Sequence, residues 1–267
     1  MIGGKLISDG GYGCVYYPSL DCNGNEINND TLISKIQRKN INSDKEYKIG
    51  SIIQSIDNYQ EHFAPILTIC DIDIRTFPQK NECRIVHKFP NTPFVTATMK
   101  YIDGKEFSTF VKESRNLKYT IISIINSYDH LLNSLQLLQD NGLCHFDLKG
   151  PNILFDETKD LPIIIDFGLS ININNIIEKR REYFYRYVPE VYLWTPEVHY
   201  INFLLHENKK PTYEDVLTLC NHYINDNYIL NELFSDDFID TYKTLCIESL
   251  SRYLDLDYLV AIKKIIK

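Results

Sequence analysis

The chain has 267 residues, of which 44% are hydrophobic and 24% charged, and its formal net charge at pH 7 is −8. These values are ordinary for a globular protein, and the length suffices for one large domain or two lobes. The acidic balance argues against sequence-independent nucleic-acid binding, which depends on an excess of Lys and Arg facing phosphates. The chain has no apolar run near the roughly 20 residues of a membrane span and no signal-peptide layout at its start. We therefore expect a soluble cytoplasmic protein with no membrane span and no nucleic-acid partner.

The cysteines are scattered along the chain, at Cys14, Cys22, Cys70, Cys83, Cys144, Cys220 and Cys246. Their number is odd and no C-x-x-C pair occurs, so the pattern indicates neither a zinc site nor a disulfide framework. We expect reduced thiols, as is usual in a cytoplasmic protein.

Strand patterns dominate the first third of the chain. Apolar residues at 6–7 and 15–17 flank the glycine-rich segment Ser8-Asp9-Gly10-Gly11-Tyr12-Gly13, which predicts a strand, a turn and a second strand. The polar stretch 21–30 contains Asn23-Gly24 and predicts a hairpin turn into a strand over 31–37. Further strands are predicted over 66–70, 83–89 and 94–102.

One helix is predicted within this strand-rich part, over 43–59. Its apolar residues recur at helical spacing, at Ile49, Ile52, Ile53 and Ile56. Ser43 is the expected N-cap, and Glu46 three positions later completes a capping box.

Helical patterns dominate the remainder. The longest runs over 119–141 and ends at Gly142; its expected buried stripe is Ile122, Ile125, Leu131, Leu132, Leu135 and Leu138. Further helices are predicted over 200–206, 213–224, 236–253 and 256–266. A strand-rich first third and a helical remainder indicate an α+β protein of two lobes, joined near Asp103-Gly104.

The most informative stretch is His145-Phe146-Asp147-Leu148-Lys149-Gly150-Pro151-Asn152, followed by Asp166-Phe167-Gly168. It places two carboxylates, an amide and a lysine at fixed spacings. Phosphoryl transfer needs such a set: one carboxylate orients the nucleophile and receives its proton, while a second carboxylate and an amide oxygen hold Mg²⁺ against the phosphates. A lysine beside the base can offset charge on the transferring group.

The order H-x-D-L-K-x-x-N and then D-F-G resembles the catalytic and metal loops of eukaryotic-type Ser/Thr protein kinases, and the chain also resembles divergent kinases of large nucleocytoplasmic DNA viruses. The resemblance implies a bilobal protein-kinase-like fold. A small antiparallel-sheet N-lobe with one helix would span 1–102, and a mainly helical, abbreviated C-lobe 103–267, together one kinase domain. The implied activity is Mg²⁺-dependent transfer of the ATP γ-phosphoryl group to Ser or Thr of a protein substrate. A viral protein would act in the host cytoplasm or the virion.

The resemblance also implies a role for each motif residue. Asp147 would accept the hydroxyl proton, with Lys149 beside it, and Asn152 and Asp166 would hold Mg²⁺. Lys35 would contact the ATP phosphates and pair with Glu46. The other residues implied in ATP binding are Gly10, Gly13 and Val15 in the phosphate loop, Met99, Lys100 and Ile102 at the adenine, Glu106 at the ribose and Leu154 at the pocket floor.

The chain departs from the family pattern at several positions. Phe146 stands where H-R-D has its arginine, which normally pairs with a phosphate on the activation segment; we therefore expect activity without such phosphorylation. Ile33 replaces the usual small residue over the adenine, and Gly50 stands where an apolar residue is expected. Trp194-Thr195-Pro196-Glu197 resembles the A-P-E close of the activation segment. Beyond Glu197 the match is poor, so we expect a short C-lobe or a truncated product.

Two other functions remain open from the sequence. A pseudokinase scaffold would keep the motifs for shape, and Ile33 and Gly50 are consistent with it. A small-molecule phosphotransferase of the aminoglycoside or choline kinase type would share H-x-D-x-x-x-x-N, but such enzymes usually lack D-F-G and the equivalent of Lys149. The protein substrate, the regulator and the oligomeric state do not follow from the sequence.

Overall fold

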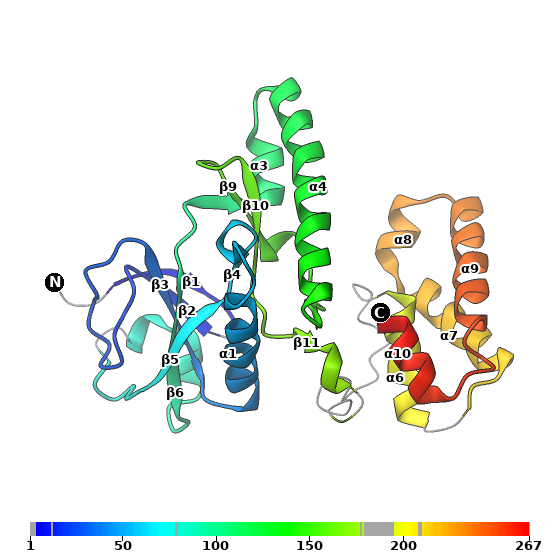
Figure 1. Ribbon diagram of the computed structural model, residues 1–267, viewed down its shortest axis with the longest axis horizontal. Coiled ribbons are helices and arrows are strands. Elements are labelled where there is room, and N and C mark those ends of the chain that lie inside the picture. The colour runs from blue at the N-terminus through cyan, green and yellow to red at the C-terminus, as the bar shows by residue number, and fades with distance from the viewer. Residues whose placement is uncertain are drawn as a thin grey trace. The chain divides into compact units, whose positions relative to one another are not determined.

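A computed structural model describes residues 4–11, 13–77, 80–176, 178, 195–207 and 210–266. The chain divides into two compact units, Met1–Asn172 and Ile173–Lys267 (Figure 1). The glycine turn, the hinge near Asp103 and both catalytic motifs therefore lie within one unit. The lobe boundary expected at 102/103 remains a prediction, since the compact units separate further along the chain.

The first unit is built on a five-stranded antiparallel sheet in the order β1-β2-β3-β6-β5. Its strands are β1 Lys5–Asp9, β2 Gly13–Tyr17, β3 Leu32–Arg38, β5 Ile66–Ile72 and β6 Phe94–Lys100. The predicted hairpin between β2 and β3 is confirmed: Gly24 has φ +80°, and Oδ1 of Asp21 accepts backbone hydrogen bonds from Asn23 and Asn25. The α+β class and the antiparallel sheet are likewise confirmed.

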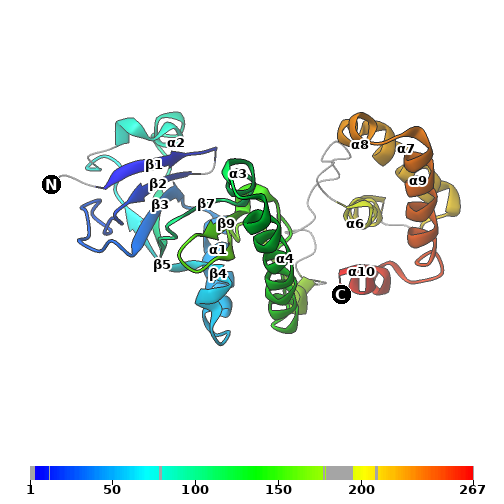
Figure 2. The ribbon, with the colours of Figure 1, turned by 90° about the horizontal axis from the view of Figure 1, so that it is seen from above.

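The two faces of this sheet carry different helices (Figure 2). Side chains alternate along β2 and β3, so Cys14 and Ile36 face the same side as helix α2, Arg84–Lys88. Lys35 lies on the opposite face, toward helix α1, Ile41–Gln54. The sheet thus separates one apolar layer under α2 from the face that carries Lys35.

Helix α1 begins earlier than predicted. Its N-cap is Asn40, whose Oδ1 accepts from the backbone N–H groups of Asn42 and Ser43, and Ser43 Oγ accepts from the N–H of Asn40 at 3.0 Å. Ser43 is therefore the third helical residue of the capping box and not its N-cap, and Glu46 lies one turn further on. Asn and Ser both cap well, so the sequence permitted either choice.

Helix α2 corrects the strand predicted over 83–89. Cys83 is its N-cap, and Ile85 and Val86 are buried against the sheet. A short apolar run of this kind fits either a strand or a buried helix, and only its surroundings decide. The sheet therefore carries a second, short helix beside the one that was expected.

A second sheet, in the order β4-β10-β9-β7, places the catalytic motifs. Its strands are β4 Phe63–Ala64, β7 Gly104–Glu106, β9 Ile153–Asp156 and β10 Leu161–Ile165. A two-stranded pair joins β8, Leu143–Cys144, to β11, Ile171–Asn172. The helices of this part are α3, Phe107–Glu113, and α4, Leu117–Asp140. The chain leaves α4 at Gly142, whose φ of +69° suits glycine.

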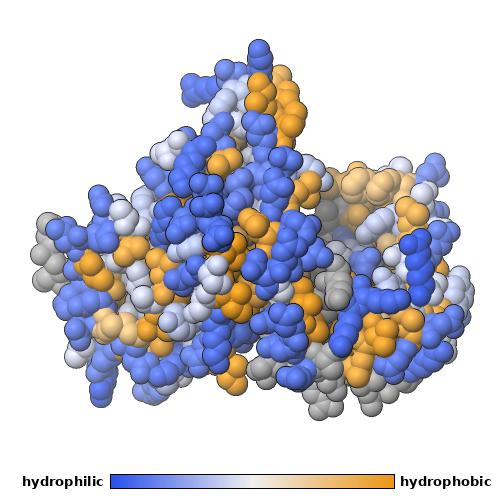
Figure 3. Space-filling view, viewed as in Figure 1, coloured by the Kyte–Doolittle hydropathy of each residue, from blue (hydrophilic) through white to orange (hydrophobic). Residues whose placement is uncertain are grey.

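The stripe predicted to be buried on α4 is only half right. Leu131, Leu135 and Leu138 pack into the core, but the side chains of Ile122, Ile125 and Leu132 are 46%, 62% and 49% exposed within the described residues. Small polar residues, Ser123, Ser127 and Ser134, take the buried positions. Figure 3 shows hydrophobic surface in orange at the tip formed by α3 and α4. Periodicity identified the helix but not which of its two apolar stripes faces the core.

The second unit is helical in its described residues. Its helices are α6 Pro196–Glu207, α7 Tyr213–Asp226, α8 Tyr228–Leu233, α9 Asp236–Ser251 and α10 Tyr258–Ile266 (Figure 1). The four predicted helices correspond to α6, α7, α9 and α10, while α8 was not predicted. Among the helices described, none combines the length and apolar character needed to cross a membrane.

The expectation of reduced thiols throughout was wrong. Disulfides join Cys14 to Cys83 and Cys22 to Cys70, with Cα–Cα distances of 5.8 Å in both. Cys144, Cys220 and Cys246 are free. The paired residues are 69 and 48 positions apart, and only the tertiary fold brings them together, so spacing alone gave no sign of the pairs.

Candidate active site

Two adjoining cavities of the first unit contain most of the predicted site residues. One, of about 490 Å³, is lined by Val15, Ile33, Met99, Lys100, Ile102, Glu106, Asn152 and Leu154. The other, of about 210 Å³, is lined by Glu46, Asp147 and Lys149. Lys35 and Asp166 line both cavities. The residues expected at the adenine and those expected at the chemistry thus occupy neighbouring spaces that meet at one ion pair.

Lys35 lies between two carboxylates. Its Nζ is 3.3 Å from Oε1 of Glu46 and 3.6 Å from Oδ1 of Asp166. Burial by itself would lower the pKa of the Lys35 ammonium, but the charges of Glu46 and Asp166 outweigh it and raise that pKa above its usual value. Lys35 is therefore a fixed positive charge at neutral pH.

Gln37 was not singled out from the sequence, yet it completes this group. It follows Lys35 by two positions and so shares its face of β3. Its Nε2 donates to Oε2 of Glu46 at 3.3 Å, in a buried environment. Both oxygens of the Glu46 carboxylate are thereby bound from one strand. The i, i+2 relation to Lys35 was the only signal that the sequence offered.

Asp147 is held by the other polar residues of its loop. Lys149 Nζ lies 3.0 Å from Oδ2 of Asp147. Asn152 Nδ2 donates to the backbone oxygen of Asp147 at 2.8 Å and to its Oδ2 at 3.0 Å. Hydrogen bonds to the charged form fix the orientation of a carboxylate before a substrate arrives.

His145 links this loop to the strand that leads to Asp166. Its Nε2 lies 3.0 Å from the carbonyl oxygen of Ile165, and its Nδ1 lies 3.3 Å from the backbone nitrogen of Asp147. A carbonyl only accepts and an N–H only donates, so the neutral tautomer with its proton on Nε2 satisfies both contacts. Burial lowers the pKa of His145, in agreement with that neutral form. The H-x-D pattern contained this residue, but the sequence gave it no role.

The D-F-G segment has an unusual backbone. Asp166 has φ +59°, in the left-handed region, as does Phe146 of the H-x-D loop, with φ +64°. The backbone N–H of Gly168 donates to Oδ1 of Asp166 at 3.3 Å. Phe167 is buried with Ile49 and Ile53 of α1, the helix that carries Glu46. The packing of Phe167 thus ties Asp166 to the helix on which Glu46 is placed.

The residues at Asn152 and Asp166 suit a hard divalent cation. Nδ2 of Asn152 is committed to Asp147, so its Oδ1 is the atom left for a ligand. Asp166 supplies a carboxylate whose side chain is 44% exposed toward the cavity. Amide and carboxylate oxygens are the ligands that Mg²⁺ accepts, usually together with water and phosphate oxygens.

The glycine turn is closed by a hydrogen bond of 3.0 Å from the N–H of Gly10 to the carbonyl of Gly13. A Cβ on Gly13 would lie 2.7 Å from the carbonyl oxygen of Ile36, so only glycine fits there. Neither Gly10 nor Gly13 is among the lining residues of the two cavities. Tyr12 and Trp194 lie outside the described residues, and with Trp194 most of the expected activation segment.

Comparisons with known proteins show what this chain is similar to. A family model described as Protein kinase domain matches residues 4–199. Serine/threonine-protein kinase ppk31 of Schizosaccharomyces pombe is 25% identical over 179 residues, which are 67% of this chain and 15% of that protein. Mitogen-activated protein kinase kinase kinase A of Dictyostelium discoideum is 25% identical over 181 residues, 66% of this chain and 17% of that protein. The chain thus matches less than a fifth of the length of either relative.

A solved structure, that of the Cydia pomonella granulovirus kinase PK-1, aligns with a TM-score of 0.42 and 18% sequence identity. The alignment covers 63% of this chain and 54% of that one.

Proposed function

Because this chain belongs to the protein kinase family, we propose that it transfers the γ-phosphoryl group of ATP to serine or threonine hydroxyls of a protein substrate, with Mg²⁺ as cofactor. The observation that carries the proposal is the group formed by Lys35, Glu46, Asp147, Asn152 and Asp166 around two adjoining cavities. Lys149 beside Asp147 and the names of the relatives support Ser/Thr over Tyr specificity. A cytoplasmic location is part of the proposal; the two disulfides, which are uncommon in cytoplasmic proteins, count against it, and cell fractionation tests it.

Each residue has a defined part in this reaction. Asp147 orients the incoming hydroxyl and accepts its proton on a carboxylate that Asn152 and Lys149 hold in place. Lys35, kept protonated by its carboxylate neighbours, offsets phosphate charge. Asn152 and Asp166 would hold Mg²⁺, which neutralises phosphate charge when bound. The gain in rate then comes from positioning and from charges fixed before the reaction.

The larger cavity would take the nucleoside. Met99, Lys100, Ile102 and Leu154 line it together with Val15, in the order that the family resemblance implies for the adenine. Glu106 lines the same cavity and would bind the ribose hydroxyls. Ile33 also lines it, so the roof over the adenine is bulkier than the family pattern suggests.

The deciding experiment is transfer of radiolabelled γ-phosphate to mixed protein substrates in the presence of Mg²⁺. The wild type should label protein, and the Asp147→Asn variant should not. Asn fits the same space, so loss of labelling reports on chemistry and not on folding, which circular dichroism checks. Labelling that is equal in both proteins would overturn the role of Asp147.

A pseudokinase scaffold is the second candidate, because Ile33 lines the nucleoside cavity where the family pattern has a small residue. Its test is thermal stabilisation by ATP and Mg²⁺, which a binding enzyme shows and a scaffold without nucleotide does not. A small-molecule phosphotransferase would instead label small alcohols such as choline or an aminoglycoside and leave proteins unlabelled.

A further inference from the structure

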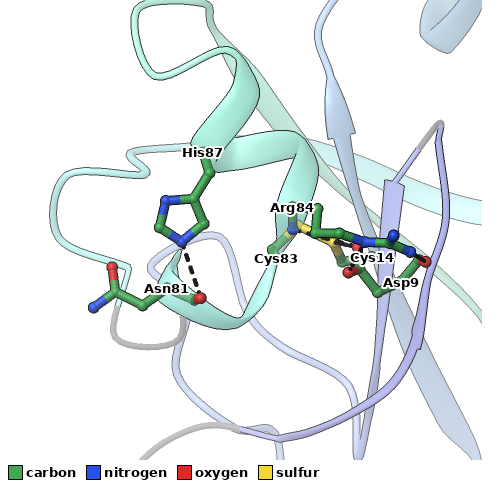
Figure 4. Close-up of a disulfide and its surroundings, with 6 residues drawn as sticks. All are labelled: Asp9, Cys14, Asn81, Cys83, Arg84 and His87. Atoms are coloured by element: carbon green, nitrogen blue, oxygen red, sulfur yellow. Dashed lines mark hydrogen bonds and ion pairs between the residues drawn. A yellow bond between two sulfur atoms is a disulfide. The ribbon is translucent and has the colours of Figure 1, made fainter.

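The base of the glycine turn is tied to two consecutive residues from a distant part of the sequence. Asp9 and Cys14 are register partners at the end of the β1–β2 hairpin, just before the turn. Cys14 is bonded to Cys83, and Asp9 is bound by the next residue, Arg84. Figure 4 shows the Arg84 side chain extended along Asp9 beside the yellow disulfide bond. Each strand that leads into the turn is therefore fixed to one of two neighbouring residues.

Arg84 binds both the side chain and the backbone of Asp9. Its Nε donates to Oδ2 at 2.6 Å, and its Nη2 donates to the carbonyl oxygen at 2.6 Å. The backbone N–H of Arg84 donates to Oδ1 at 3.3 Å. An exposed ion pair usually contributes little, but these three bonds fix the position of the strand end. The Asp9 side chain is only 19% exposed, so this contact is partly shielded.

The segment that holds Cys83 and Arg84 is anchored in the buried core. Cys14 and Cys83 are completely buried, and the residues that follow Arg84, Ile85 and Val86, are buried in the same apolar cluster beneath the sheet. Cys14 Sγ also lies 3.2 Å from Oδ1 of Asp9, a contact and not a hydrogen bond because a disulfide sulfur carries no hydrogen. The anchor is thus part of the core and not a mobile loop.

The Cys14–Cys83 bond lies on the face of the sheet opposite the larger cavity, in which we place the nucleoside. Val15 lines that cavity, and Cys14, its neighbour on β2, points to the opposite face. Neither Cys83 nor Arg84 lines either cavity of the candidate active site. Any effect of these two residues on the reaction is therefore indirect, through the conformation of the turn or through Ile85, the next residue, which lines the smaller cavity.

We propose that Cys83 and Arg84 are positioning residues that hold the phosphate turn and so set the affinity of the protein for a nucleoside triphosphate. The inference rests on the proposed function, since it concerns the same nucleotide site. A tethered turn has fewer conformations to lose when its backbone N–H groups close over phosphates, and binding is stronger for that reason. Forming the Cys14–Cys83 bond passes two electrons and two protons from two thiols to a disulfide oxidant such as oxidised glutathione, which leaves as two thiols.

The chain contains a matched control in its second disulfide. Cys22–Cys70 closes a loop of 48 residues against 69 for Cys14–Cys83, with the same Cα–Cα distance. Loop-closure entropy depends weakly on length, so removing either bond should lower thermal stability to a similar extent. Cys22 and Cys70 line neither site cavity. Only the loss of Cys14–Cys83 should change nucleotide binding.

The experiment compares Cys14→Ser/Cys83→Ser, Cys22→Ser/Cys70→Ser and Arg84→Gln with the wild type. Titration calorimetry with Mg²⁺ and a non-hydrolysable ATP analogue measures Kd, and hydrogen exchange follows residues 5–17. For Cys14→Ser/Cys83→Ser we expect faster hydrogen exchange in residues 5–17 and a Kd raised about tenfold. A tenfold change corresponds to the conformational entropy of the backbone of about one residue. Arg84→Gln keeps the disulfide and should raise Kd severalfold; because Arg84 is exposed, this variant serves if the cysteine variant does not fold.

The outcomes separate the two proposals. A wild type that binds no nucleotide would contradict the proposed function, and with it the proposed effect of Cys83 and Arg84 on nucleotide affinity. Equal Kd values for the Cys14/Cys83 and Cys22/Cys70 variants in a wild type that binds sink the positioning role alone. Non-reducing peptide mapping of the wild type should find both disulfides. Free thiols at Cys14 and Cys83, or a metal ion held by them with Asp9, would also overturn the proposal.

Discussion

Gln37 donates from Nε2 to Oε2 of Glu46, while Lys35, two residues earlier on the same strand, binds Oε1 of that carboxylate. Each of these contacts is 3.3 Å long. Glu46 is therefore held from both oxygens by β3. A carboxylate held by two contacts keeps one orientation. Because Lys35 makes one of these contacts, Glu46 also fixes the position of the Lys35 ammonium, which lines both cavities.

Replacing Gln37 by Leu should lower kcat/KM for peptide phosphorylation about tenfold, the kinetic equivalent of a charged hydrogen bond worth about 1.5 kcal/mol. The Lys35–Glu46 pair would remain but lose its second support. Gln54→Leu is the matched control. Gln54 lies on α1, the helix that carries Glu46, and donates to the carbonyl of Ile66 and not to Glu46. Equal losses in both variants would mean that α1 was merely loosened.

The close approach of β5 to α1 explains why Gly50 stands where the family pattern expects an apolar side chain. A Cβ there would lie 2.5 Å from the carbonyl oxygen of Ile66 on β5. Gly50→Ala should gain about 1 kcal/mol of helix propensity but lose about 1–3 kcal/mol to overpacking, so the free energy of unfolding should fall by up to about 2 kcal/mol. Urea denaturation measures the difference, with Ser51→Ala on the exposed side of the helix as control. A more stable Gly50→Ala protein would show that the helix moves away at little cost.

Asp166 should tolerate Asn better than Ala. Its φ of +59° lies in the left-handed region, which Asn adopts more readily than Ala. We expect Asp166→Asn to abolish ATP turnover and stabilisation by ATP with Mg²⁺ while it keeps near-wild-type thermal stability, whereas Asp166→Ala loses stability as well. Thermal melts with and without nucleotide test both parts. Undiminished turnover in Asp166→Asn would exclude the proposed metal role.

Two stacked imidazoles should make the first unit sensitive to acid. The rings of His62 and His130 lie 4.5 Å apart and nearly parallel, at 5°. Burial, and then the charge of His130, lower the pKa of His62, and burial also lowers that of His130. The unfolded chain, with a histidine pKa of about 6.5, then binds more protons than the folded one just below that pH, so stability is complete above it and falls as the pH drops further.

The measurement is the melting temperature from pH 8 to pH 5 for the wild type and for His130→Gln. The variant should lose less stability on acidification, because it removes one of the two rings. His87→Gln, at an exposed position of the same unit, is the control and should follow the wild type. Identical pH profiles for all three proteins would contradict the prediction.

The proposed kinase activity should not depend on phosphorylation of the activation segment. Phe146 stands at the position from which an arginine would bind the phosphate, so the segment has no such partner at that point of the motif. A phosphatase-treated preparation should keep its rate of peptide phosphorylation. Activity that disappears on this treatment and returns on rephosphorylation would contradict the prediction.

Local patterns were sufficient for many of the elements and for the residue types of the proposed chemistry. Alternation and turn residues predicted β1, β2, β3, β5 and β6, and helical spacing predicted α1 and α4, because these signals act over a few neighbouring residues. The motif around Asp147, together with Asp166, identified the residue types that phosphoryl transfer needs. Such signals are weakest for a short apolar run, and so the run at Ile85-Val86 was predicted as a strand although it forms a helix.

Tertiary structure decided what depends on residues far apart in sequence. Asp9 meets Arg84 across 75 positions and Cys14 meets Cys83 across 69, and neither contact leaves a periodic trace in the chain. The sequence by itself predicted which side chains would carry the proposed chemistry. The packed sheet determined that Gln37 supports Glu46. It also determined that Cys83 and Arg84 hold the two strand ends at the glycine turn, because both features depend on which faces and edges the strands bring together.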